Sequence, residues 1–158
     1  MDANELKIRL TELAAKLKVE INDRLPIVAG KMAVDFFKKS FNNEGFTDQT
    51  YERWPEVKRR QDPRIRGARA TRKILTGDTG DLGESITYQI RTPGEVVIKA
   101  EAYNPRGFNY APVHNQGVTD AGRNRNVVIP KRQFIGPSKT LEKEIEKEID
   151  RKIRDILK

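Results

Sequence analysis

Apolar residues recur at helical spacing near both ends of the chain, and this limits the folds that the sequence can adopt. The N-terminal stripe consists of Leu6, Leu10, Leu13, Leu17 and Ile21. The C-terminal stripe consists of Leu141, Ile145, Ile149, Ile153 and Ile156. Steps of three and four residues place each set on one face of an α-helix. Asp2 with Glu5 predicts a capping box for the first helix, and Ser138 predicts the N-cap of the last.

A second helix and a β-hairpin are predicted between these two stripes. The first helix is expected to end near Asn22, and Pro26 suits the first turn of a second helix that ends before Asn42. Residues 86–91 and 95–101, joined by a Pro-Gly turn, predict a hairpin, and residues 127–129 predict a third strand. The sequence therefore predicts an α+β fold, with N-terminal helices and a C-terminal helix packed on a small antiparallel sheet.

The composition is that of a modest core with a highly charged surface. The chain has 158 residues, of which 36% are hydrophobic and 34% charged, and we expect a single domain over residues 1–158. There is no cysteine, which excludes disulfides, thiolate zinc sites and cysteine nucleophiles. A charged N-terminus and the lack of a long apolar run predict no signal peptide and no membrane span. We therefore expect a soluble protein.

The positive charge is concentrated in one stretch, residues 58–73, which we call the basic segment. Its eight basic residues are Lys58, Arg59, Arg60, Arg64, Arg66, Arg69, Arg72 and Lys73. Against Asp62 alone they give +7, which leaves +1 of the total of +8 for the rest of the chain. Residues 42–73 have few apolar anchors and are predicted to form a long loop or arm, with Trp54 and Pro55 at its root. Such a segment is either a solvated, flexible loop or a contact surface for nucleic acid or an acidic partner.

The stretch YAPVHNQG, residues 110–117, contains the one histidine of the sequence. A zinc site needs three or four ligands, mostly His and Cys, so His114 cannot form one. No G-x-S-x-G motif surrounds any serine, which disfavours a Ser-His-Asp hydrolase. We predict instead a structural corner, in which Tyr110 and Val113 face the core and the imidazole bonds a nearby backbone group.

The glycines of residues 74–86, ILTGDTGDLGESI, suggest a phosphate-binding loop at first sight. They match neither G-x-x-x-x-G-K-[ST] nor G-x-G-x-x-G, which disfavours a nucleotide site. Asp78, Asp81 and Glu84 lack the alternating spacing of a calcium loop, so we predict that Asp78 or Thr79 caps a helix. A metal-dependent nuclease would need clustered carboxylates, and Asp81 with Glu95 and Lys99 lacks the usual spacing. We predict no metal and no cofactor.

Three motifs in order resemble the virion morphogenesis family of tailed bacteriophages and Mu-like prophages. The first is Ile74-Leu75 with Gly80-x-Leu82-x-x-Ser85-Ile86. The second is Tyr110-Ala111-x-x-His114-x-x-Gly117. The third is Ile129-Pro130-x-Arg132-x-Phe134-x-Gly136. The resemblance covers nearly the whole chain, although Gln133 stands where the family often has a second proline and residues 105–125 form a longer segment than usual.

The resemblance implies a non-enzymatic structural protein of virion assembly, which acts in P2-like or Mu-like tail completion or at the head-tail junction. It implies a ring of identical subunits, partners among tail or head-connector proteins, and assembly in the cytoplasm of the bacterial host. Residues 52–73 and the loop 104–126 are the expected contact surfaces between subunits. Double-stranded DNA in a central channel is a further possible partner, whereas no membrane and no small-molecule substrate is expected. The alternative is a DNA-binding protein that uses the basic segment.

The structural corner implied by these motifs comprises seven residues. They are Tyr110, His114, Gly117, Pro130, Arg132, Phe134 and Gly136. We refer to residues 110–117 and 129–136 together as the corner, and we expect it to organise the fold.

Overall fold

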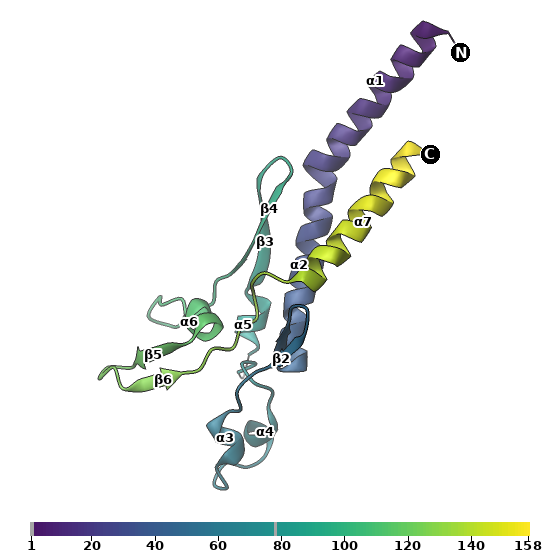
Figure 1. Ribbon diagram of the computed structural model, residues 1–158. Helices are drawn as coiled ribbons and strands as arrows, with labels where there is room; N and C mark the ends of the chain where they lie inside the picture. The colour runs from purple at the N-terminus through teal and green to yellow at the C-terminus, as the bar shows by residue number, and fades with distance from the viewer. Residues whose placement is uncertain (1, 78) are drawn as a thin grey trace.

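A computed structural model describes residues 2–77 and 79–158 of the chain. Its helices are α1 (Ala3–Val19), the π-helical η1 (Glu20–Arg24), α2 (Leu25–Asn43), α3 (Lys58–Gln61), α4 (Ala68–Thr71), α5 (Asp81–Glu84), α6 (Ala111–Gln116) and α7 (Lys139–Leu157). Its strands are β1 (Gly45–Thr47), β2 (Tyr51–Arg53), β3 (Ile86–Thr92), β4 (Glu95–Ala100), β5 (Val118–Ala121) and β6 (Val127–Ile129). The predicted α+β class is confirmed, with α7 beside the N-terminal helical rod and the small sheets around its lower half (Figure 1).

The two N-terminal helices form one continuous rod, so the predicted break between them near Asn22 is wrong. The chain passes from α1 through η1 into α2 with right-handed helical backbone angles at both junctions. The predicted capping box at the start of α1 is confirmed, because Asp2 and Glu5 bond each other's backbone N–H groups at 2.8 and 3.1 Å. The rod ends at Asn43, after which Glu44 adopts a left-handed conformation with φ of 55°.

Pro26 explains why the rod contains a π-helical turn. Proline has no backbone N–H, and its ring clashes with the carbonyl four residues earlier, which here belongs to Asn22. A single π turn relieves such a clash while the helix continues. The carbonyl of Asn22 accepts a hydrogen bond from Gly94, in the turn of the β3–β4 hairpin, at 3.0 Å. Because of the proline, the carbonyl of Asn22 lacks its usual helical donor. The hairpin is attached to the rod through this carbonyl.

The strands form three separate two-stranded antiparallel sheets. The predicted hairpin is confirmed as β3 paired with β4, with Tyr88 opposite Ile98. The predicted strand at residues 127–129 is confirmed as β6, but it pairs with β5 and not with the hairpin. The reason is local, since α6 and Gly117 turn the chain so that β5 lies directly beside β6.

One cluster of buried side chains connects these elements. It contains Ala33, Phe37, Phe41, Phe46, Trp54, Ile74, Leu82, Ile86, Ala102, Ala111, Phe134 and Leu141. The members come from α2, β1, both ends of the basic segment, α5, β3, the residues that follow β4, the corner and the start of α7. The core therefore lies around the lower half of the rod, where segments that are distant in sequence meet.

Ser138 caps α7 as predicted. Its hydroxyl accepts the N–H of Leu141 at 3.2 Å and donates to the carbonyl of Thr47 at 3.0 Å. Asp48 accepts the N–H of Lys139 at 2.7 Å through its carboxylate, and its carbonyl accepts the hydroxyl of Thr140. The turn between β1 and β2 therefore holds the first turn of α7.

The outer end of the rod is largely uncovered. The 17 residues of α1, all of them in the described part of the chain, include no buried residue. Leu6, Ile8 and Leu10 are 43%, 58% and 57% exposed. The stripe that predicted the helix from the sequence therefore lies mostly outside the core of this chain.

Two further expectations concern the glycine-rich turn and the membrane. The N-cap of α5 is Gly80 in a left-handed conformation without a side-chain hydrogen bond, so the predicted cap by Thr79 is wrong, and Asp78 lies outside the described residues. Within the described residues, no helix combines the length and the apolar character that crossing a membrane would need.

Gly30 gives a test of how the hairpin packs on the rod. A Cβ at this position would lie 2.6 Å from the ring of Tyr88 and 3.0 Å from Val96. Although alanine is the better helix former, we expect Gly30→Ala to lower the free energy of unfolding by about 1–2 kcal/mol, because overpacking outweighs the gain in propensity. The measurement is urea denaturation followed by circular dichroism.

Gly83→Ala is the matched control, because its Cβ would meet the ring of Phe41 at 3.5 Å or more, an ordinary contact. We expect this variant to be neutral or more stable by up to about 1 kcal/mol. Equal effects of the two substitutions would contradict the close approach of Tyr88 to the rod.

Candidate functional site

The corner begins with α6 and ends in a turn that requires glycine. Pro112 lies in the first turn of α6, and the helix ends at Gly117 with φ of 75°. A Cβ on Gly117 would lie 2.6 Å from the backbone nitrogen of Lys131. Both the backbone angle and the close approach exclude a side chain here. The second and third sequence motifs therefore lie against each other at this point.

Asn115 holds the two halves of the corner together. Its carboxamide oxygen accepts the N–H groups of Phe134 and Ile135 at 2.8 and 3.0 Å, and its amide nitrogen donates to the carbonyl of Ile135 at 3.0 Å. The resemblance treated this position as variable, so sequence reasoning missed the residue. The available signal was an asparagine in a turn-rich stretch, a residue type that often bonds backbone groups.

Phe134 and Trp54 place the corner against α2. Phe134 is fully buried and its ring centroid lies 5.2 Å from that of Phe41. Trp54 packs edge-on against Phe41 at 5.5 Å and donates its indole N–H to the carbonyl of Gln133 at 2.7 Å. Trp54, at the root of the basic segment, therefore anchors that root on the core. Gln133 contributes its carbonyl, a group that a proline would also supply.

Arg132 is a buried arginine that connects the corner to the start of the basic segment. It is 7% exposed, and its guanidinium donates to the carbonyls of Pro55 and Glu56 at 3.0 and 3.3 Å. Its backbone N–H donates to the carbonyl of His114 at 2.9 Å. Burial and the charge of Arg59 lower the pKa of Arg132. Among the described residues no carboxylate forms an ion pair with it.

His114 is half-buried and packs edge-on against the ring of Tyr110, with centroids 6.0 Å apart. Burial lowers the pKa of His114, and the nearby charge of Arg132 lowers it further. The predicted bond from the imidazole to the backbone is wrong for Nδ1, which is buried with no hydrogen-bond partner among the described residues. An unsatisfied buried polar atom lowers the stability of the folded state by about 1–3 kcal/mol, so a hydrogen-bond donor or acceptor for this nitrogen would stabilise the protein.

The remaining corner residues have simpler positions. Pro130 and Gly136 are half-buried, and a Cβ on Gly136 would meet the mobile end of the Gln133 side chain. The described residues contain no group of three or more His, Asp or Glu side chains that could hold a metal ion. The corner therefore brings its predicted members together around packing and hydrogen bonds.

The expected extended arm at residues 42–73 is instead a folded lobe. It contains the β1–β2 hairpin, α3 and α4. Arg59 donates to the carbonyls of Arg69, Arg72 and Lys73 at 3.2, 2.7 and 2.8 Å. These bonds close the basic segment into a loop, because they connect its start to its end.

Glu44 anchors this loop to the end of the rod. Its carboxylate accepts two hydrogen bonds from the guanidinium of Arg60 and a third from the N–H of Ile74 at 2.7 Å. Arg60 also donates to the carbonyl of Arg72 at 2.9 Å. The hydrogen bond from Arg60 is the main cause of the lowered pKa of Glu44. Two of the eight predicted contact residues, Arg59 and Arg60, therefore hold the lobe together.

The other basic residues differ in how accessible they are. Lys58, Arg66 and Arg69 have exposed side chains, and no carboxylate of the described residues pairs with them. Arg64 is exposed but forms a forked pair with Asp62, both bonds being 2.9 Å long. Lys73 donates to the carbonyl of Asn42 at 3.0 Å, and Arg72 is half-buried. The outward charge of the segment is thus smaller than the sequence suggests.

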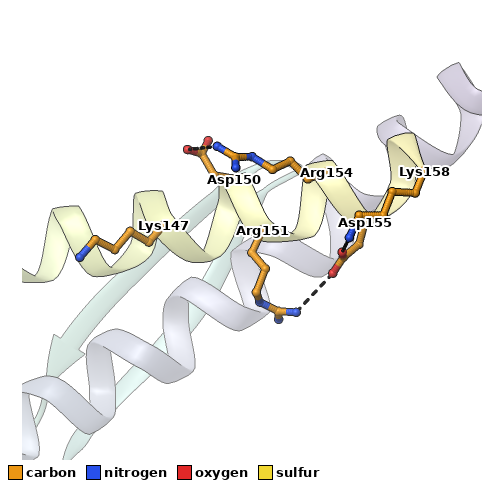
Figure 2. Close-up of a pocket in the computed structure, with 6 residues that line it drawn as sticks. All are labelled: Lys147, Asp150, Arg151, Arg154, Asp155 and Lys158. Atoms are coloured by element: carbon orange, nitrogen blue, oxygen red, sulfur yellow. Dashed lines mark hydrogen bonds and ion pairs between the residues drawn. The ribbon is translucent and has the colours of Figure 1, made fainter.

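The outer face of α7 carries a shallow hollow of about 490 Å³ (Figure 2). It is lined by Lys147, Asp150, Arg151, Arg154, Asp155 and Lys158. Arg151 and Lys158 both pair with Asp155, and Arg154 pairs with Asp150, at distances of 3.0 to 4.0 Å. These are ordinary pairs along one exposed helix, which contribute little individually. We read this hollow as a solvated surface.

Comparisons of the chain with family models, with curated proteins and with solved structures find no match. The resemblance to the virion morphogenesis family therefore stays a prediction.

The Glu44 interaction predicts a pH-dependent stability. Because the pKa of Glu44 is lowered in the folded state, its contribution is present above the unfolded value of about 4.3 and is lost as the pH falls through the folded value. The side chains of Glu44 and Arg60 are 16% and 21% exposed. We expect Glu44→Gln to lower the free energy of unfolding by about 2 kcal/mol at pH 7. Urea denaturation between pH 7 and 3 should show this difference narrowing below pH ~4.

Glu52→Gln, on the exposed face of β2, is the control, and it should change the stability by less than about 0.5 kcal/mol. A constant difference between the wild type and Glu44→Gln over this range would contradict the ionised role of Glu44.

Proposed function

We propose that this chain is a non-enzymatic structural protein of a tailed bacteriophage or prophage, which acts in tail completion or at the head-tail junction as a ring-forming subunit. Its partners are then copies of itself, tail or head-connector proteins, and double-stranded DNA in the channel. As a virion component it is assembled in the cytoplasm of the bacterial host. The order of the three motifs supports the family, and the surface of the molecule supports the ring.

The observation that carries the proposal is the amount of surface left uncovered. A compact monomer of 18.1 kDa exposes about 8,100 Å². The accessible surface of this chain is 11320 Å². The excess is about 3,200 Å² per subunit, or about 1,600 Å² on each subunit for each of two interfaces. Counted over both partners, one interface would then bury about 3,200 Å², which lies within the range of obligate assemblies. A subunit of a closed ring has two such interfaces, because one surface of each copy meets a different surface of the next.

The exposed apolar residues agree with this reading. Leu6, Ile8 and Leu10 are uncovered on α1, and Val127 and Val128 are exposed on β6 at another end of the molecule. Leu6 and Leu10 lie one turn apart on the same face of α1, and an apolar helix face of this kind is usually buried by a partner. The occupant that we propose for α1 is a neighbouring copy of the same chain, because the uncovered area matches what two subunit contacts remove.

Leu10→Asp tests the role of α1 in assembly. An aspartate at a buried contact loses apolar area and places a charge in the interface, so the assembly should dissociate toward the subunit mass of 18.1 kDa. The measurement is native mass spectrometry or light scattering over a range of concentrations. Thr11→Asp is the control, since Thr11 is also exposed on α1 and is already polar, and its assembly should be unchanged.

Two outcomes would count against this proposal. If the Leu10→Asp variant assembles to the same mass as the wild type, α1 is not part of the interface. A wild-type mass of one subunit at every concentration, alone and after mixing with tail or connector proteins, would overturn the ring.

The alternative function, DNA binding through the basic segment, is favoured by the exposed side chains of Lys58, Arg66 and Arg69. Replacing all three with alanine should weaken binding to duplex DNA and reduce the slope of log affinity against log salt by up to about 3. Arg59 and Arg60 are left intact because they hold the lobe together. The measurement is fluorescence anisotropy with a short duplex at several salt concentrations.

The control for this experiment removes the same charge elsewhere, with alanine at Arg106, Arg123 and Lys131, three exposed positions outside the segment. Equal losses for the two triple variants would indicate binding by net charge alone and would contradict a specific role of the basic segment.

A further inference from the structure

A cavity of about 330 Å³ lies where the corner meets the basic segment and the glycine-rich turn. Its wall includes Arg59 from α3, Thr76 and Thr79 from the turn, Tyr110 and His114 from the corner, and Arg132. Apolar side chains, among them Val57 and Leu82, complete the wall. A few polar groups that converge in a largely apolar hollow of this size are typical of a small-ligand site.

The charges around this cavity are unbalanced. Arg59 and Arg132 are both held by backbone carbonyls, and neither forms an ion pair with a carboxylate of the described residues. Arg132 is 7% exposed. The carboxylate of Glu56 attracts Arg132 and Arg59 without forming an ion pair with either. A bound anion would place a counter-charge at hydrogen-bond distance from both guanidinium groups, which would offset the cost of burying Arg132. Among the described residues that line the cavity, Asp81 is the one that carries a carboxylate, and it is exposed to solvent.

Both guanidinium groups retain donors for such an anion. Each guanidinium has five N–H donors. Among the described residues, the hydrogen bonds of Arg59 to carbonyls use three of these donors and those of Arg132 use two. The carbonyls fix the planes of both groups in advance, which reduces the entropy that binding would otherwise cost.

We propose that this cavity binds a phosphate group, with Arg59 and Arg132 as its main ligands and His114 as a group that is protonated on binding. Charge favours phosphate over a carboxylate ligand. Among the described residues of the wall, the two arginines and Asp81 sum to +1, and a protonated His114 makes +2. Glu44 and Glu56 lie outside this wall and weaken its positive field without reversing it. A phosphate dianion balances a charge of +2, and a carboxylate does not. The buried, unpartnered Nδ1 of His114 marks the imidazole as a group with unused bonding capacity. This inference does not depend on the proposed ring.

The charged groups that face the imidazole set the sign of its response. Burial and Arg132 disfavour the protonated ring of His114, with Arg59 and the phenol of Tyr110 also in the wall and Asp81 across the cavity. A bound dianion opposes both effects and must raise the pKa of His114. Linkage then requires that a dianion binds more tightly as the pH falls through the titration of this histidine.

The single histidine provides a direct readout. NMR spectra of the imidazole of the intact protein are followed against pH, with and without inorganic phosphate at constant ionic strength. We expect saturable shifts with phosphate and a rise in the His114 pKa of about half a unit or more. Sulfate, which stays a dianion over the whole range, should bind more tightly at pH 5 than at pH 7, by about threefold or more. Shifts that chloride reproduces, or an unmoved pKa, would overturn the site.

Asp81→Asn tests where the anion binds, because this substitution should increase the affinity for phosphate. A purely structural role of the cavity would not produce such an increase. Removing this exposed negative charge should tighten phosphate binding roughly threefold to fivefold. Glu84→Gln is the control on the same short helix, because Glu84 pairs with Lys38 outside the wall of the cavity, and its affinity should equal that of the wild type. Equal affinities of the wild type and Asp81→Asn would contradict the placement of the anion.

The source of the phosphate is distinguished by a competition. A short DNA duplex that shifts the His114 signals, and is displaced by inorganic phosphate, would identify the site with a nucleic acid backbone. A duplex that leaves these signals unchanged while inorganic phosphate moves them would identify a free phosphate ion or a small phosphate ester. The oligomer mass is measured in the same samples. It tests the ring proposal independently, so phosphate binding and ring formation can each be accepted or rejected separately.

Discussion

The contact of Trp54 with Phe41 and with the carbonyl of Gln133 supports much of the fold. Phe41 belongs to the last turn of the rod, Trp54 to the root of the basic segment, and Gln133 to the corner, so one indole connects three regions that are far apart in sequence. Phe134 closes the same group from the corner side. Burying these aromatic rings stabilises the contact between the three regions, and the indole N–H bond sets the register of the corner relative to the rod.

Positive charge in this chain has two distinct physical roles. Arg59, Arg60 and Arg132 face inward and satisfy backbone carbonyls that the folded lobe would otherwise leave without donors. Lys58, Arg66 and Arg69 point to solvent and remain available for an external partner. A guanidinium suits the inward role, because its planar fork reaches several carbonyls at once. Counting charges along the sequence cannot separate the two groups, since only the fold shows which side chains turn inward.

The core and the outer end of the rod follow different rules. Around Phe37 and Phe134 the apolar residues meet one another within the chain, whereas Leu6 and Leu10 meet none of the buried cluster. Their periodicity is the same as that of a core-facing helix, because an interface between subunits and a hydrophobic core select the same spacing of apolar residues. In proteins most of the stability of a helix comes from packing of its apolar face, which is a further reason to look for a partner on the uncovered surface of α1.

The sequence by itself determined the class of the fold and most of its local elements. Helical stripes, the caps at Asp2 and Ser138 and the β3–β4 hairpin depend on neighbouring residues, so they were predictable. Only the tertiary structure decided that the rod continues through Pro26, since the freed carbonyl of Asn22 is satisfied by Gly94 from a distant turn. The same holds for the candidate site. Its members were identified singly, but the role of Asn115 and the cavity beside His114 arise from contacts between segments that no local pattern encodes.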